Sequence, residues 1–178
     1  MLYLIGGPVR VGKSGLARLV SQRLGVFSLT TDALTTMIGR VLPETRLAGG
    51  KIPQEEWENN FYPFLRKFLK TVQFDYEDFI LEGAVISPTI VHKLSDKFDL
   101  QCIFVGNSEA ELITLLEYMG PNIWLRNASP EELQLIPQNI IVRSKELEKA
   151  SEECGYSYVD LAGDYGKHLE KAYKLLTG

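Results

Sequence analysis

One short segment near the start of the sequence combines glycines, a lysine and a serine in a spacing that suits phosphate binding. Gly7-Pro-Val-Arg-Val-Gly12-Lys13-Ser14 matches the pattern G-x-x-x-x-G-K-[ST] at every fixed position. The glycines let the backbone turn tightly so that several N–H groups face one point, and a following helix adds its positive N-terminal end. Lys13 supplies a point charge, and the Ser14 hydroxyl can bind Mg²⁺. This is the Walker A pattern, which predicts a bound nucleoside triphosphate.

The neighbouring sequence supports that prediction over a simple tight turn. The apolar run at residues 2–5 is typical of a strand, and apolar residues recur at helical spacing from Leu16 until Gly25 ends the pattern. Strand, glycine loop and helix are the order that phosphate binding requires. We take the nucleotide to be ATP with Mg²⁺, bound by Gly7, Pro8, Val9, Arg10, Val11, Gly12, Lys13, Ser14 and Gly15.

The rest of the chain alternates between strand-like and helix-like stretches, which is the α/β pattern. Strands are predicted at residues 2–5, 26–29, 79–81, 101–105 and 156–161. Helices are predicted to begin with Thr31 or Asp32 as a cap, to span 57–72 with a kink or a break at Pro63, and to begin at Ser87-Pro88, Ser108 and Ser129 before a last helix around 169–176. Ser108 with Glu111, and Ser129 with Glu132, have the capping-box spacing.

Composition excludes several classes of protein. A chain of 178 residues with 45% hydrophobic and 24% charged residues is one ordinary globular domain. Nineteen basic against 23 acidic residues give a net charge of −4, which argues against nucleic acid as the main partner. Two cysteines and two histidines exclude a structural zinc site and disfavour a disulfide framework. No run approaches the length of a membrane span, so we expect a cytoplasmic protein, as a monomer or homodimer.

Walker A proteins include GTPases, motor and transport ATPases, and small-molecule kinases, and the other motifs separate these classes. The N-K-x-D motif for guanine is absent. The D-x-x-G match at Asp160-Leu-Ala-Gly163 follows the fifth predicted strand and not the third, so we treat it as a coincidence. The apolar run ending in Asp-Glu that transport and remodelling ATPases carry is also missing. Kinases of small molecules remain.

The sequence resembles the small P-loop kinases, the group of adenylate, shikimate and gluconate kinases. Gly6-Gly-Pro-Val-Arg-Val-Gly-Lys-Ser14 is similar to the adenylate kinase loop, and Ile80-Leu-Glu-Gly83 to the strand that ends there in Asp-Gly. Glu-Gly at that place is similar to uridine kinases and archaeal kinases of phosphoglycerate. Ala84-Val-Ile86 departs from the Phe-Pro-Arg of adenylate kinases. The resemblance implies a three-layer α/β fold with a five-stranded parallel sheet and one domain over residues 1–178, with an acceptor-binding insertion at about 40–75 and an abbreviated lid at about 120–138.

The resemblance gives two carboxylates candidate roles. Asp32 follows the second strand, where shikimate-type kinases carry an acidic residue, and would accept the proton of the attacking hydroxyl or hold Mg²⁺ through water. Glu82 ends a buried strand that lies beside the loop strand in this fold, and would bind substrate or join Ser14 in holding Mg²⁺. The structural alternatives are a helix cap at Asp32 and a salt bridge at Glu82.

Cations are needed to balance charge on the transferred group. Arg126 lies in the predicted lid, and Arg143 shares a helix face with Ile140 and Leu147, so both are candidate catalytic residues, with solvent exposure or a structural ion pair as the alternative. Arg40, with Arg46 and Lys51, would bind an anionic acceptor or else belong to a solvated surface. By resemblance, residues 160–166 would flank the adenine. The aromatic stripe Trp57, Phe61, Phe64 and Phe68 is predicted to be core, with a wall of the acceptor pocket as the alternative.

These patterns together predict transfer of the γ-phosphate of Mg-ATP to a hydroxyl or phosphate of a small metabolite. One alternative is a nucleoside or nucleotide kinase. The other is a nucleotide-binding regulatory module without transfer activity, which the sparse lid arginines favour.

Overall fold

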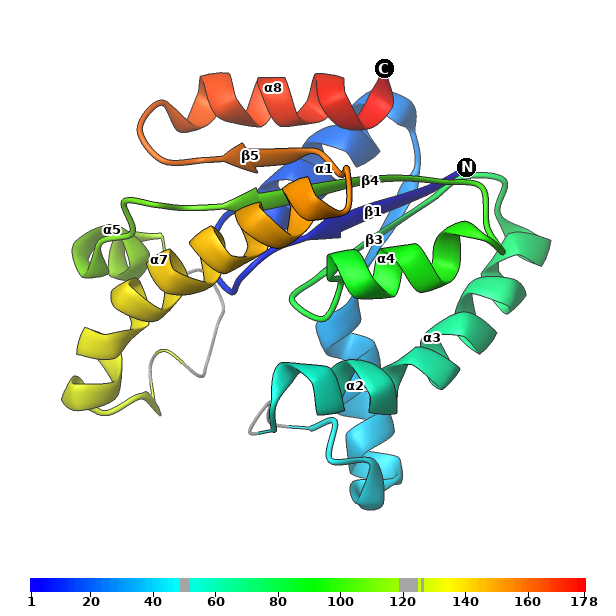
Figure 1. Cartoon of the computed structure of the whole chain (residues 1–178), viewed down its shortest axis with the longest axis horizontal. Coiled ribbons are helices and arrows are strands. Elements are labelled where there is room, and N and C mark those ends of the chain that lie inside the picture. The colour runs from blue at the N-terminus through cyan, green and yellow to red at the C-terminus, as the bar shows by residue number, and fades with distance from the viewer. Residues whose placement is uncertain (49–51, 119–124, 126) are drawn as a thin grey trace.

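Five parallel strands form one sheet at the centre of the molecule. The computed structural model describes residues 1–48, 52–118, 125 and 127–178. The strands are β1 (Leu2–Gly6), β2 (Phe27–Thr30), β3 (Phe79–Gly83), β4 (Leu100–Gly106) and β5 (Tyr158–Asp160), in the spatial order β2-β3-β1-β4-β5 (Figure 1). The predicted α/β class and the five-stranded parallel sheet are confirmed.

The strand register brings the carboxyl ends of three strands to one level. Ile5 of β1 lies opposite Glu82 of β3, and Thr30 of β2 lies opposite the same glutamate. Because ligands of open parallel sheets bind outside the carboxyl ends of the strands, this edge is where a site is expected. The glycine loop, Glu82 and the start of the helix after β2 all meet there.

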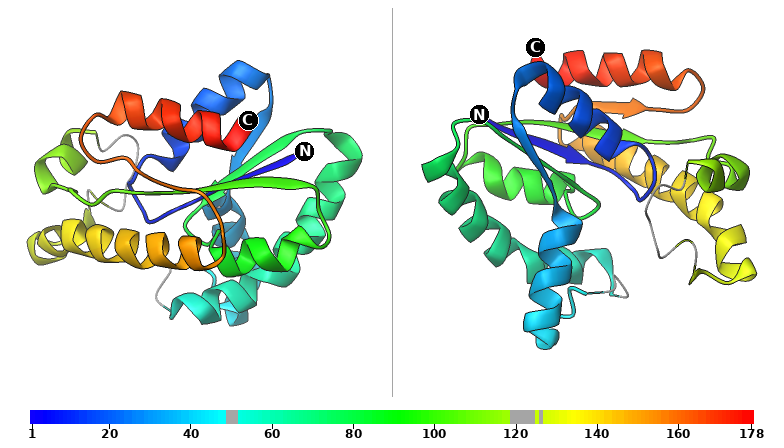
Figure 2. Two further views of the ribbon diagram at one scale, coloured as in Figure 1. Left: turned by 45° about the horizontal axis from the view of Figure 1, so that its top comes forward. Right: turned by 180° about the vertical axis from the view of Figure 1, so that it is seen from behind.

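Helices cover both faces of the sheet. They are α1 (Lys13–Leu24), α2 (Thr31–Val41), the 3₁₀ turn η1 (Pro43–Thr45), α3 (Gln54–Asp75), α4 (Pro88–Ser95), α5 (Leu112–Glu117), α7 (Pro130–Glu153) and α8 (Tyr165–Thr177). Figures 1 and 2 show α1 and α8 on one side of the sheet and α3, α4 and α7 on the other. This is the predicted three-layer arrangement. Within the described part of the chain, none of these helices is both long and apolar enough to cross a membrane.

Alternation along the strands divides the apolar residues between two cores. Leu4 of β1 points into a core with Phe61 and Leu65 of α3, whereas Ile5 packs on the other face with Leu16 of α1. Phe61 is fully buried, and the other three aromatic residues of its stripe are partly buried against the same core, so the predicted core role of the stripe is confirmed. The alternation therefore explains how one sheet supports a helical layer on each side.

Two of the predicted helix features are found, and of the two alternatives at Pro63 the structure shows the kink and not the break. Gly25 adopts a left-handed conformation with φ 68° and ends α1, as its position predicts. Ser129 and Glu132 form a complete capping box at the start of α7. Pro63 does not break α3, which runs without interruption from Gln54 to Asp75 and changes direction along its length (Figure 1). The 22-residue helix keeps its continuity because its buried face packs along the sheet-side core.

Two predicted caps are wrong. The cap of α2 is Thr30, whose side chain accepts a hydrogen bond from the Asp32 backbone N–H. The sequence pattern predicts Thr31 or Asp32 as the cap. Ser108 and Glu111 form no capping box, because α5 begins only at Leu112 without a side-chain cap. The Ser108 backbone N–H instead donates to the Asp160 carboxylate at 3.1 Å, a long-range bond that local spacing does not reveal.

Candidate active site

The glycine loop between β1 and α1 has the backbone geometry of a phosphate cradle. Gly12 has φ 108°, a conformation that favours glycine, and Arg10 is in the left-handed region with φ 64°. A Cβ at Gly7 would overlap the carbonyl oxygen of Val105, so only glycine fits between the loop and β4. The Arg10 side chain turns away to donate to the carbonyls of Leu115 and Tyr118 near α5. Its predicted contact with the nucleotide therefore concerns the Arg10 backbone.

Lys13 holds a buried ammonium group at the first position of α1. Lys13 is 8% exposed, and its Nζ donates a hydrogen bond to the Pro8 carbonyl across the loop at 2.7 Å. Burial lowers the pKa of Lys13, and the negative charges of Glu82 and Asp32 act in the opposite direction. A buried cation with these surroundings is ready to accept an anion such as a phosphate.

Ser14 and Glu82 are brought together from α1 and β3. The Ser14 hydroxyl donates to Glu82 Oε1 at 2.9 Å, and Glu82 is 7% exposed. No described Lys or Arg forms an ion pair with Glu82, so the salt-bridge alternative is not realised within the described chain. A hydroxyl and a carboxylate oxygen are hard ligands of the type that Mg²⁺ takes, so this pair fits the predicted metal site.

Asp32 lies in the first turn of α2 with an exposed side chain. It is close enough to Lys13 for its charge to act on the lysine pKa. Because Thr30 supplies the cap, capping does not account for the Asp32 carboxylate. Asp32 is therefore available for chemistry at the same edge of the sheet as Lys13 and Glu82.

Within its described residues, the structure does not bring the predicted arginines together at the site as it does Lys13, Ser14, Asp32 and Glu82. Arg40 is exposed near the end of α2, and Arg46 pairs with Glu56 at 2.7 Å. Arg143 is exposed, which corrects its expected place on the inner face of α7. The buried face of α7 is a narrow stripe formed by Ile140, Ser144 and Ser151, and Arg143 lies outside that stripe. Arg126 and Lys51 lie outside the described residues, so their predicted roles, like that of Arg143 in catalysis, stay predictions.

The segment after β5 lies against the end of the glycine loop. The Asp160 carboxylate accepts from the backbone N–H groups of Ser108 and Ala162, which fixes the start of the segment. A Cβ at Gly12 or Gly15 would run into the Tyr165 ring or hydroxyl. This position is consistent with the prediction that residues 160–166 flank a nucleotide base.

No protein-family model matches the chain, and no curated protein matches its sequence. Similarity to known proteins is found among solved structures. A gluconokinase from Sinorhizobium meliloti 1021 has a TM-score of 0.60 at 17% identity, covering 98% of this chain and 90% of its own. Shikimate kinase from Acinetobacter baumannii in complex with shikimate gives 0.59 at 13% identity, with coverages of 98% and 90%. A sugar kinase from Janibacter sp. HTCC2649 gives 0.58 at 14% identity, with coverages of 98% and 93%.

This chain has the fold of the P-loop small-molecule kinases. The likeness spans nearly the whole length of both partners in each comparison, so the predicted resemblance is confirmed at the level of the fold. At identities of 13–17% it does not extend to the acceptor.

Sequence reasoning missed two residues that border this site of the P-loop kinase fold. Gln54 and Glu58, one turn apart at the start of α3, are joined by a hydrogen bond from the Gln54 amide to Glu58 Oε1 at 3.0 Å. Glu58 is 6% exposed. The signal that could have identified it is its spacing, because Glu58 precedes the buried Phe61 and Leu65 by three and seven residues on one helix face.

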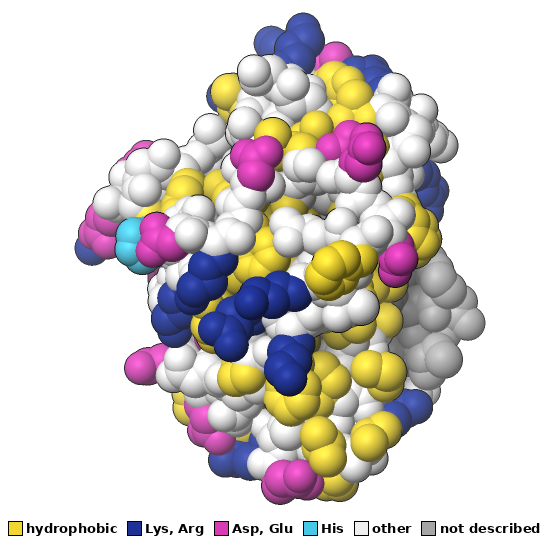
Figure 3. Space-filling view, turned by 90° about the vertical axis from the view of Figure 1, so that its right-hand side faces the viewer, with side chains coloured by type: hydrophobic (Ala, Val, Ile, Leu, Met, Phe, Trp, Pro, Cys, Tyr) yellow, Lys and Arg dark blue, Asp and Glu magenta, His cyan; other side chains and the backbone are white. Residues whose placement is uncertain are grey.

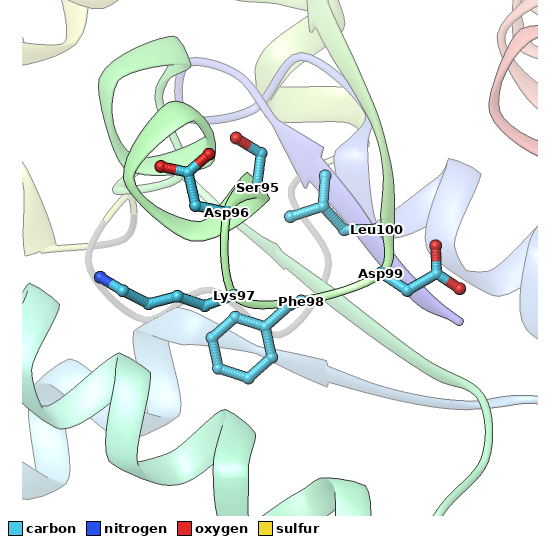
Figure 4. A pocket seen from close by; sticks show the side chains of 6 residues that line it. All are labelled: Ser95, Asp96, Lys97, Phe98, Asp99 and Leu100. Carbon is cyan, nitrogen blue, oxygen red and sulfur yellow. The ribbon is translucent and has the colours of Figure 1, made fainter.

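A separate hollow of about 490 Å³ lies at the turn between α4 and β4 and is lined by residues 95–100. Leu100 begins β4, so this hollow lies at the opposite edge of the sheet from the glycine loop. Figure 4 shows its side chains pointing in different directions from the turn.

Nearby, Lys93 and Lys97 both lie over the Tyr62 ring, and Figure 3 shows Lys and Arg side chains gathered on one face of the molecule. Neither feature joins the P-loop site.

Proposed function

We propose that this protein is an ATP-dependent kinase that transfers the γ-phosphate of Mg-ATP to a hydroxyl or phosphate of a small metabolite. The observation that carries the proposal is the meeting of Lys13, the Ser14–Glu82 pair and Asp32 at the carboxyl edge of the sheet. A Walker A loop alone accounts only for nucleotide binding. Transfer to a hydroxyl also needs a group that accepts the hydroxyl proton, and the exposed carboxylate of Asp32 near Lys13 can do so.

Each residue has a distinct part in the proposed reaction. The loop amides and Lys13 hold the β- and γ-phosphates, while Ser14 and Glu82 hold Mg²⁺, which neutralises charge on the phosphate oxygens when bound. Asp32 accepts the acceptor's hydroxyl proton as its oxygen bonds to the γ-phosphorus. The bond from phosphorus to the β–γ bridging oxygen breaks, and ADP leaves. Arg126 and Arg143 would stabilise the developing charge, and Arg40 would contact the acceptor. We place this activity in the cytoplasm, in a monomer or homodimer.

Binding of Mg-ATP is tested by melting the protein with and without the nucleotide. At a concentration one hundred times the dissociation constant, binding stabilises the fold by about 2.7 kcal/mol, which raises the melting temperature by roughly 5–10 °C. Lys13→Met should lose most of that shift without melting earlier on its own, because methionine keeps the buried stem and removes a desolvated charge. A wild-type melting curve that neither Mg-ATP nor Mg-GTP moves contradicts the proposal.

Transfer itself is tested by acceptor-stimulated ADP release. Lys13→Met should lower the rate by a factor of about 10²–10³, because a charge-assisted contact that tightens in the transition state is lost. If ATP binds but none of the acceptors stimulates the release of ADP, the protein is instead a regulatory module.

A further inference from the structure

A buried carboxylate at the start of α3 has no cation to balance it among the described residues. Glu58 is 6% exposed, and its hydrogen-bond partner is the neutral amide of Gln54. None of the ion pairs within the described chain includes Glu58. Removing a carboxylate from water costs several kcal/mol unless a positive group or several hydrogen bonds compensate it. One amide N–H compensates only part of that cost.

Glu58 lies next to the end of β3 that carries the proposed metal ligand. The amide nitrogen of Gln54 that donates to Glu58 also lies 3.5 Å from the carbonyl oxygen of Ala84. Ala84 comes two residues after Glu82, whose carboxylate bonds to Ser14. Gln54 therefore connects Glu58 directly to the edge of the sheet where phosphoryl transfer is proposed.

A second buried polar group faces the same short segment without a partner. Thr31 is 0% exposed, and within the described chain its Oγ1 makes no hydrogen bond. That oxygen points at Gly83, so closely that a Cβ there would overlap it. The indole N–H of Trp57, beside Glu58, is likewise buried without a described partner. Buried polar groups are rarely left unsatisfied, so hydrogen bonds remain to be made around residues 82–84.

The charges at this edge discriminate between classes of acceptor. Three carboxylates, those of Asp32, Glu58 and Glu82, lie near this edge of the sheet. Among the described cations, Lys13 donates its hydrogen bond to the Pro8 carbonyl of the glycine loop, and Arg40 is exposed. An anionic acceptor would add a further negative group to this set. A positively charged acceptor would compensate Glu58, and its hydroxyl groups could pair with the Thr31 and Trp57 donors.

Resting on the kinase function proposed above, we infer that the phosphate acceptor is a hydroxyl compound that carries an amine, with its ammonium group bound by Glu58. The Gln54 amide holds the Glu58 carboxylate in place on α3. This assigns Glu58 as a residue that determines specificity for amino alcohols or amino sugars over sugar acids.

The inference is tested with acceptors that differ in charge on related carbon skeletons. ADP release is measured with glucosamine, glucose and gluconate, with ethanolamine as a smaller amine and shikimate as a second acid. We expect an amine to be preferred, with kcat/KM at least about tenfold above that of the neutral and acidic compounds, the size expected for one charge-assisted hydrogen bond. A preference for gluconate or shikimate, or no stimulation by either amine, overturns the inference.

Glu58→Gln separates recognition from a structural role. Glutamine keeps the shape and a hydrogen bond to Gln54, so the ligand-free variant should melt at or above the wild-type temperature because a desolvated charge is removed. Its preference for the amine should fall about 10–100-fold. Glu55→Gln, an exposed carboxylate in the first turn of the same helix, should leave that preference unchanged. A variant that fails to fold, melts clearly earlier or keeps the preference assigns Glu58 to the scaffold and overturns the inference.

The two proposals fail in different ways in these experiments. If Mg-ATP does not raise the melting temperature, the kinase function fails. If Mg-ATP binds and an acid is phosphorylated in place of an amine, the kinase function stands and the assignment of Glu58 fails.

Discussion

Two carboxylates of the candidate active site have contrasting surroundings that suit different tasks. Glu82 is buried and accepts a hydrogen bond from Ser14, so its oxygen is held in a fixed place. Asp32 is exposed and its helix is capped by another residue. A fixed carboxylate suits a metal ligand, whereas an accessible one can meet a substrate hydroxyl. The contrast favours Asp32 over Glu82 as the proton acceptor.

We predict that Asp32→Asn separates chemistry from structure. The Thr30 cap stays intact, and the loss of one negative charge from the first turn of α2 should change stability by less than about 1 kcal/mol. Phosphoryl transfer should fall by a factor of about 10² or more because the proton acceptor is gone. One melting curve and one ADP-release rate from the same preparation check both parts.

The control for this variant is Glu55→Gln, which removes an exposed charge from the first turn of α3. It should affect neither readout beyond the small contribution of the helix dipole. Turnover of Asp32→Asn close to that of the wild type would exclude Asp32 as the base.

The residues of the site differ in how far the sequence reveals them. Lys13 and Ser14 are predictable because the motif is contiguous and its chemistry is local. Glu82 is predictable from its place at the end of an apolar run. The buried face of Glu58 follows from its helical spacing with Phe61 and Leu65, but its hydrogen bond to Gln54, and the contact of Gln54 with Ala84, do not follow from that spacing. Polar contacts between distant segments leave no periodic pattern in the sequence.

At the scale of elements, periodicity predicts the order of strands and helices, while their ends depend on single hydrogen bonds. The start of α7 is correct because its capping box is entirely local. The start of α5 is wrong because Asp160, more than fifty positions away, takes the Ser108 N–H. Thr30, Thr31 and Asp32 are all good caps by type, so the sequence alone does not choose among them.

The capping box of α7 predicts a measurable contribution to stability. Ser129 accepts a hydrogen bond from the Glu132 backbone N–H at 3.2 Å, and the Glu132 side chain accepts from the Ser129 N–H at 2.8 Å. Ser129→Ala should therefore lower the free energy of unfolding by about 1 kcal/mol, measured by urea denaturation. Ser129→Asp should retain most of the stability because aspartate caps equally well. Equal loss in both variants would mean that the cap is not what stabilises this helix end.

At the scale of the whole molecule, the two-sided core holds weak acids that keep their protons in the folded state. Burial raises the pKa of the Cys102 thiol on β4 to about 11. Burial also raises the pKa of Tyr158 on β5, and the nearby charge of Asp160 adds to the effect. Both groups ionise more easily in the unfolded chain, so alkaline conditions favour unfolding.

Cys102 makes this dependence testable. Its pKa rises from 9.0 to about 11 on folding, so its contribution to stability is fully present below pH 9 and is lost as the pH rises to 11. Between pH 8 and 10 the thiol alone should lower the free energy of unfolding by about 1 kcal/mol.

Cys102→Val, which suits a strand and cannot ionise, should show a correspondingly shallower decline in the free energy of unfolding, measured by urea denaturation, across this range. Cys154→Ser, at an exposed position, should decline like the wild type. If Cys102→Val declines as steeply as the wild type, burial of this thiol does not set the alkaline limit, and Tyr158→Phe becomes the variant to compare above pH 10.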